Sequence, residues 1–202
     1  ATKMVGARRE GMPANVAIPY AMSIGLRPGY FGGHYLGIEH DPFETVADAN
    51  SPRFQVQNVN LPNGLSVDRL SDRRGLLKQF DVLRKEADQT GMMDAMTRFE
   101  QNAFDMVTGP LARKAFDIHS EDPRLRDRYG RTPWGQSTLL ARRLVEAGST
   151  FVTCHFGGWD HHWNLQAGME RYLPQIDQLV SALFEDLHQR GLWEKTLVML
   201  CG

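Results

Sequence analysis

Residues 151–164 read FVTCHFGGWDHHWN. The first six are apolar or β-tolerant and are followed by two glycines, which predicts a buried strand that ends at residue 156. A carboxylate and two imidazoles come directly afterwards. Alternate side chains of an extended segment point to the same side, so Asp160 and His162 can face one ion while His161 faces away. The stretch predicts a metal half-site, because most transition-metal sites use three or four protein ligands.

Helical and strand patterns alternate around this stretch. Thr132-Pro133 supplies an N-cap and a first-turn proline for a helix over residues 133–147, and a wide apolar stripe predicts a second helix over residues 168–190. Residues 196–201 have the pattern of another buried strand. The order α-β-α-β predicts an α/β fold with a parallel sheet and right-handed crossovers. Ligands of such sheets bind beyond the carboxyl ends of strands, where Asp160 and His162 lie.

The earlier part of the chain divides into two regions. Residues 1–70 are rich in turns, with short β-like runs at residues 15–18 and 54–59. Residues 71–120 have a helical period that predicts a hairpin of two amphipathic helices, one over Leu76 to Ala87 and one over Met92 to Val107. A charged connector covers residues 122–130. We expect residues 1–202 to form one partial α/β domain, with residues 130–202 as its α-β-α-β core segment.

Composition excludes several classes of function. The chain has 202 residues, 42% of them apolar, and a formal net charge of −1 without a long run of one sign, so we expect no nucleic-acid partner. No stretch approaches the roughly 20 apolar residues of a membrane span, and no signal peptide is visible. Cys154 and Cys201 lie in predicted strands and indicate no disulfide framework. Dinucleotide-binding and phosphate-loop motifs are absent.

Four blocks of sequence carry a resemblance to a known family: GQSTLLARRLVEAG at residues 135–148, GWDHH at 158–162, LPQID at 173–177 and RGLWEKTLV at 190–198. They resemble successive blocks of the DUF1501 family, sulfatase-like bacterial proteins that are similar to the alkaline phosphatase superfamily. The resemblance is specific from about Tyr129 to Gly202. The family's tryptophan is typically followed by Asp-Thr-His, whereas this chain has His161 in the middle position, which makes His161 a candidate third ligand.

The resemblance implies a three-layer, parallel-sheet fold like that of alkaline phosphatase, incomplete at both ends. It also implies a divalent metal ion, zinc, manganese or iron, with Asp160 and His162 on the family's ligand positions. It further implies that this chain is an internal fragment, because family blocks with other metal positions lie before and after it, and we expect the fragment alone to be inactive. Cys154 lacks the Cys/Ser-x-Pro-x-Arg setting of a sulfatase nucleophile, so the nucleophile is unassigned.

The function implied by the resemblance is metal-dependent hydrolysis of sulfate or phosphate esters, with a small-molecule or glycan ester as substrate and a periplasmic or secreted location. Two alternatives remain open. One is a non-catalytic envelope or secreted protein of the same fold that binds a partner or has a structural role. The other is a binding module that uses the Gly-, Tyr- and His-rich residues 29–41, although ordinary turn chemistry also explains that region.

Overall fold

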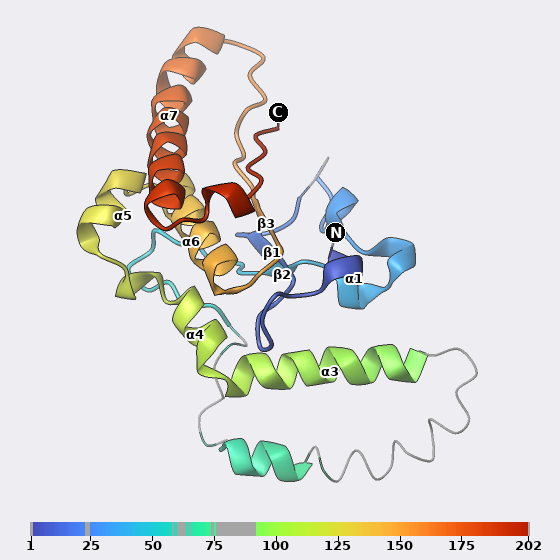
Figure 1. Cartoon of the computed structure of the whole chain (residues 1–202). Helices are drawn as coiled ribbons and strands as arrows, with labels where there is room; N and C mark the ends of the chain where they lie inside the picture. Colours follow the sequence, from blue (N-terminus) through green and yellow to red (C-terminus); the bar gives the residue numbers. More distant parts are fainter. Residues whose placement is uncertain are drawn as a thin grey trace.

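The computed structural model of the protein describes residues 2–22, 25–57, 59, 64, 66–73, 75 and 92–201 (Figure 1). The strands among them are β1 (Asn15–Ile18), β2 (Phe43–Glu44) and β3 (Phe151–Cys154). The α-helices include α1 (Thr2–Val5), α3 (Met92–Thr108), α4 (Pro110–Phe116), α5 (Pro123–Tyr129), α6 (Pro133–Ala147) and α7 (Leu165–Gln189). Short 3-10 helices are η1 (Gly29–Phe31), η2 (His34–Leu36), η3 (Ile38–His40), η4 (Ile118–Ser120) and η5 (Trp193–Lys195).

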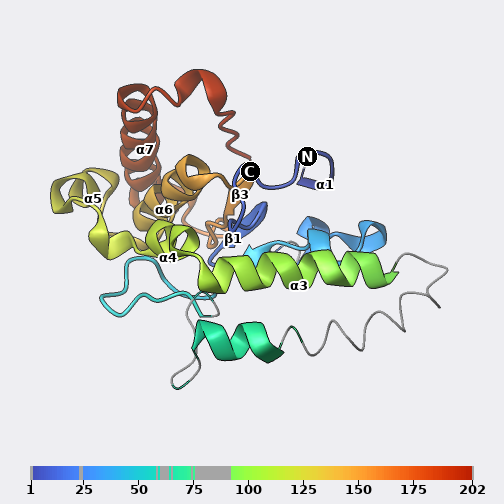
Figure 2. The same ribbon diagram turned by 60° about the horizontal axis from the view of Figure 1, so that its bottom comes forward.

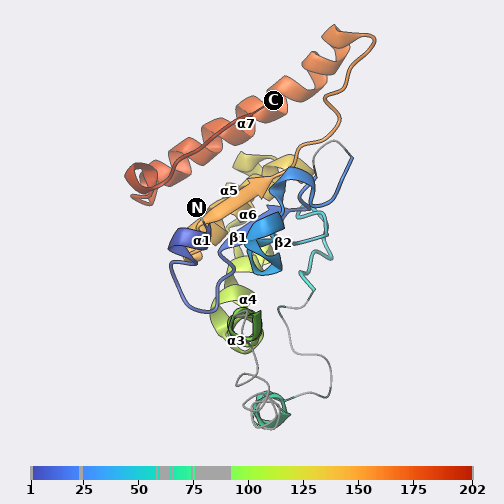
Figure 3. The same ribbon diagram turned by 90° about the vertical axis from the view of Figure 1, so that its right-hand side faces the viewer.

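The described strands form a parallel sheet in the order β2-β1-β3. Ala17 of the central strand pairs with Glu44 on one side and with Thr153 on the other. Val16, Ala17 and Ile18 are fully buried, whereas Phe151 on the outer strand β3 is 45% exposed. Figure 3 shows β3 in front of β1 and β2. The predicted α/β fold with a parallel sheet is therefore confirmed.

Helices cover the two faces of the sheet unequally. Figures 1 and 2 show α4, α5, α6 and α7 on one side of the strands, and α1 with the short helices of residues 29–40 on the other. The core lies where α6 meets the sheet, because Leu139, Leu140 and Leu144 are fully buried in one cluster with Val16 and Ile18. Burial of these side chains fixes α6 against the central strand.

Helix α6 begins and ends where local sequence signals place it. The Thr132 hydroxyl accepts a hydrogen bond from the Gly135 N–H at 3.0 Å, as an N-cap should, and Pro133 follows it. Gly148 ends α6 with a φ of 118°, a left-handed conformation that favours glycine. The predicted helix over residues 133–147 is confirmed as α6, and the one predicted over residues 168–190 is confirmed as α7, which begins earlier, at Leu165.

Two predicted strands are wrong. Residues 196–201 form no strand, and Leu197, Met199 and Leu200 are 85%, 70% and 68% exposed. The described residues of the run 54–59 form none either, although Phe54, Val56 and Val59 are buried. An alternating or apolar pattern reports which side chains can be buried, but a strand also needs a neighbouring strand to pair with.

The region between the sheet strands also differs from expectation. The second helix of the predicted hairpin is confirmed as α3, whereas the first, over Leu76 to Ala87, lies outside the described residues. The charged connector 122–130 is the helix α5, and its Arg126 is buried rather than solvated. The Arg126 Nε donates to Gln136 Oε1 at 2.7 Å, so a polar partner on α6 compensates the burial. No helix in the described part of the chain could cross a membrane.

A cluster of charged side chains joins α6 to α7 and to the turn after η4. Arg142 on α6, whose side chain is 1% exposed, donates from Nη2 to Glu121 Oε2 at 2.6 Å. Its Nε lies 2.8 Å from Asp186 Oδ2 on α7, a close ion pair without hydrogen-bond geometry. Arg143 Nη1 donates to the same Glu121 oxygen at 2.8 Å, and the Tyr129 hydroxyl donates to Asp186 at 3.0 Å. This cluster makes the packing of α6 on α7 depend on paired charges.

Candidate metal-binding loop

The loop between β3 and α7 brings Asp160 and His162 together. His162 Nε2 lies 3.0 Å from Asp160 Oδ1, and the two side chains are 67% and 86% exposed. Two ligands about 2.0–2.1 Å from a tetrahedral ion lie about 3.3 Å apart, so this spacing is close to what a shared ion requires. The pair follows the carboxyl end of β3, as predicted.

His161 lies apart from this pair and packs on α7. Its ring centroid is 5.6 Å from that of Tyr172, and its Nε2 is buried without a hydrogen-bond partner. A Cβ atom added to Gly168 would come within 2.7 Å of the same imidazole. The absence of a side chain at Gly168 therefore makes room for His161 against the helix.

Aromatic rings hold the start of the loop. Trp134, at the beginning of α6, stacks on Phe156 at 5.3 Å and on Trp159 at 5.5 Å, and lies 5.0 Å from Tyr172 of α7. Such contacts are worth about 0.5–1.5 kcal/mol each beyond the area they bury. Trp163, by contrast, is 82% exposed. The side chains of Trp159 and His161 therefore pack against the helices. Those of Asp160, His162 and Trp163 are exposed to solvent.

A complete metal site is not present in the described part of the chain. No group of three or more His, Cys, Asp or Glu residues there has the geometry to hold an ion. In the described part of the chain, Asp160 and His162 pair with each other and no third such residue joins them.

Both cysteines are free, and Cys154 is unsuited to nucleophilic attack. Burial raises the pKa of the Cys154 thiol to about 12, and its Sγ lies 3.5 Å from the Ser137 carbonyl oxygen. The thiolate is the nucleophilic form of cysteine, so this residue stays unreactive near neutral pH.

A second group of polar side chains lies at the carboxyl edge of the sheet. Tyr20 follows β1 and His155 follows β3, and their ring centroids are 5.5 Å apart. The Arg27 guanidinium lies 5.0 Å from the Tyr20 ring centroid and forms an ion pair with Glu44, the last residue of β2. Glu44 also accepts a hydrogen bond from the Ala21 N–H at 2.9 Å.

The sequence analysis did not identify Tyr20, Arg27 or Glu44 as members of a site. Tyr20 comes two residues after the predicted strand 15–18, so its position next to a strand end was a usable signal. Glu44 gave no such signal, because β2 has only two residues and shows no period. Arg27 is placed by its contacts with Tyr20 and Glu44, which depend on the tertiary structure.

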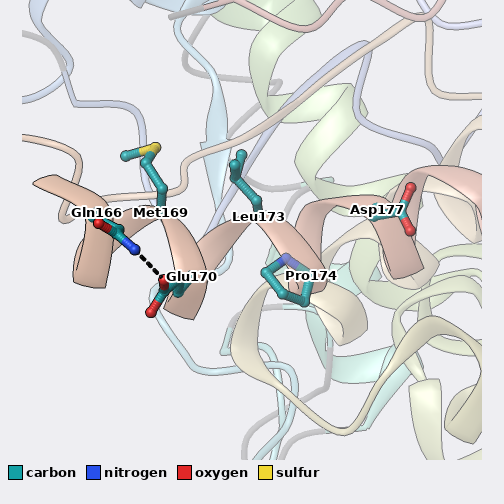
Figure 4. Close-up of a pocket in the computed structure, with 6 residues that line it drawn as sticks. All are labelled: Gln166, Met169, Glu170, Leu173, Pro174 and Asp177. Atoms are coloured by element: carbon teal, nitrogen blue, oxygen red, sulfur yellow. Dashed lines mark hydrogen bonds between the residues drawn. The ribbon is translucent and has the colours of Figure 1, made fainter.

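Two other regions, residues 29–41 and a hollow along α7, offer weaker candidates for a functional site. In residues 29–41, Gly33 N–H donates to Asp41 Oδ1 at 2.6 Å and His34 Nε2 lies 2.9 Å from the Gly29 carbonyl, which are local turn contacts. Figure 4 shows a hollow along α7 whose lining comes from that one helix: Gln166, Met169, Glu170, Leu173, Pro174 and Asp177. None of the three predicted metal ligands lines it.

Comparison with known proteins supports the family resemblance. No curated protein and no solved structure matches the chain. The family profile described as "Protein of unknown function (DUF1501)" matches residues 1–202. The chain therefore belongs to the DUF1501 family.

Proposed function

We propose that this chain is part of a metal-dependent hydrolase of sulfate or phosphate esters, with a sulfatase-like fold related to alkaline phosphatase. The observation that carries the proposal is the contact between His162 Nε2 and Asp160 Oδ1 at 3.0 Å, in an exposed loop beyond the carboxyl end of β3. An imidazole nitrogen and a carboxylate oxygen suit zinc, manganese or iron.

The residues of the loop have separate roles in this proposal. Asp160 and His162 would hold the ion, and His161 would position the loop through its contact with Tyr172. A bound divalent ion would polarise the ester oxygen and lower the pKa of a bound water molecule. The Trp134 stack keeps the anchored part of the loop in one conformation, which limits the entropy lost when a ligand binds at the tip.

Metal content measured by mass spectrometry tests the proposal. The longest gene product that contains this chain is loaded with zinc, manganese or iron, desalted, and compared with its Asp160→Ala/His162→Ala variant. We expect bound metal in the wild type and its loss in the double variant, with unchanged circular dichroism. His161→Ala should keep the metal, because its imidazole packs on α7.

A matched control is available in the same chain. Glu39 and His40 also form an acid–imidazole pair, 3.9 Å apart, and do not follow a strand of the sheet. Glu39→Ala/His40→Ala should bind as much metal as the wild type. Equal metal in all four proteins would contradict the proposed role of the loop and favour a non-catalytic binding or structural protein.

A further inference from the structure

We propose that the carboxyl edge of the sheet carries a binding site for a tetrahedral oxyanion such as phosphate or sulfate, formed by Tyr20, Arg27 and His155. The site is separate from Asp160 and His162 and needs no metal ion. It therefore goes beyond the proposed hydrolase function and can be tested independently of it.

The position of the group follows from the strand order. The strand β2, which follows β1 in the sequence, pairs with one edge of β1. The next strand, β3, pairs with the opposite edge of β1. The strand order therefore reverses between β1 and β3, and ligands of open parallel sheets bind in the crevice at such a switch point. Tyr20 and His155 closely follow the two strands that flank it, and their rings are in contact at 5.5 Å.

Tyr20, Arg27 and His155 have donor or acceptor atoms that their described neighbours do not use. Glu44 engages Arg27 through Nε and Nη2, and the side chain of Arg27 is 44% exposed. Within the described part of the chain, Arg27 Nη1, the Tyr20 hydroxyl and the His155 ring nitrogens have no hydrogen-bond partner. The guanidinium is thus held in place by one carboxylate while one of its edges stays available to a ligand.

The chemistry of the free groups selects an anion. A guanidinium and a phenol donate hydrogen bonds, and an imidazole donates from at least one nitrogen, whereas a cation would be repelled by Arg27. The ion pair with Glu44 raises the pKa of Arg27, so the guanidinium keeps its charge. Three donor groups, with Tyr20 in contact with both Arg27 and His155, offer more hydrogen bonds than the two oxygens of a carboxylate need and suit the larger number of oxygens of a tetrahedral oxyanion.

Titration with inorganic phosphate, sulfate and acetate at constant ionic strength, in the presence of a chelator, tests the site. Isothermal calorimetry gives the affinity, and chemical shifts of the His155 imidazole give the location. We expect phosphate and sulfate to bind more tightly than acetate. Arg27→Met should weaken phosphate binding about 10- to 100-fold, the effect of losing one charge-assisted hydrogen bond. Tyr20→Phe, which keeps the ring, should weaken it by a smaller factor.

Two controls distinguish this site from nonspecific anion binding and from the metal-binding loop. Arg128 also forms an exposed ion pair, with Glu185, but lies on α5, so Arg128→Met should bind phosphate like the wild type. Asp160→Ala/His162→Ala should also bind phosphate normally, so the site can stand if the metal proposal fails. Wild-type affinity in both Arg27→Met and Tyr20→Phe, equal binding of acetate, or no phosphate binding to the wild type would overturn the inference.

Discussion

Glu121 is the residue at which a single substitution should most affect the packing of α6 on α7. Its side chain is 12% exposed and accepts hydrogen bonds from Arg142 and Arg143 at 2.6 and 2.8 Å. Glu121→Gln keeps the shape of the side chain but removes its charge. The buried Arg142 then keeps Asp186 and the half-exposed Glu146 as its charged partners among the described residues. We expect this substitution to destabilise the protein at neutral pH.

The pKa of Glu121 sets the size of the effect. Burial alone would raise that pKa, but the hydrogen bonds and the positive charges of Arg143 and Arg142 together outweigh burial and lower it from 4.5 to about 2. This lowering corresponds to about 3 kcal/mol of folding free energy, or about 2–3 kcal/mol after allowance for solvent screening. Because the folded-state pKa is depressed, the contribution is present above the unfolded pKa of about 4.5 and is lost as the pH falls towards 2.

Urea unfolding followed by circular dichroism measures this contribution. The free energy of unfolding of Glu121→Gln should be about 2–3 kcal/mol below that of the wild type at neutral pH. The difference should shrink steadily below about pH 4.5, because the unfolded wild type takes up a proton at Glu121 there, whereas the folded protein does so only near pH 2. Glu185→Gln is the control, because Glu185 forms an exposed ion pair with Arg128 and should cost less than about 1 kcal/mol. A Glu121→Gln effect no larger than the control, or one independent of pH, would refute the reasoning.

Two further predictions concern the α6 cap and the cysteines. Thr132→Ala removes the side-chain acceptor for the Gly135 N–H and should lower the free energy of unfolding by about 1 kcal/mol, measured by urea denaturation. An unchanged denaturation midpoint would show that the cap contributes nothing. A maleimide should label exposed Cys201 in the native protein and leave Cys154 unmodified until urea is added, because the pKa of Cys154 is about 12. Equal native labelling of both thiols, read by peptide mass spectrometry, would contradict that assignment.

The sequence alone was sufficient for the parts of the fold that local signals specify. Thr132-Pro133 and Gly148 determine where α6 begins and ends, because capping depends on neighbouring residues. The apolar stripe of α7 and the apolar run that begins at Phe151 were also sufficient to predict a helix and a strand, although β3 is not buried as predicted, because Phe151 is 45% exposed. The two-residue spacing of Asp160 and His162 also led to the prediction that their side chains face the same side, and they lie 3.0 Å apart in the structure.

Only the tertiary structure decided which elements and side chains meet. Strand pairing needs a partner as well as a pattern, so residues 196–201 are apolar and yet unpaired. His161 stands beside Asp160 in sequence but packs on Tyr172, because Gly168 leaves space for its imidazole. Tyr20 and His155 are far apart in the sequence and touch only because β1 and β3 are neighbours in the sheet. Contacts between distant residues depend on the packing of the whole chain, which no local period encodes.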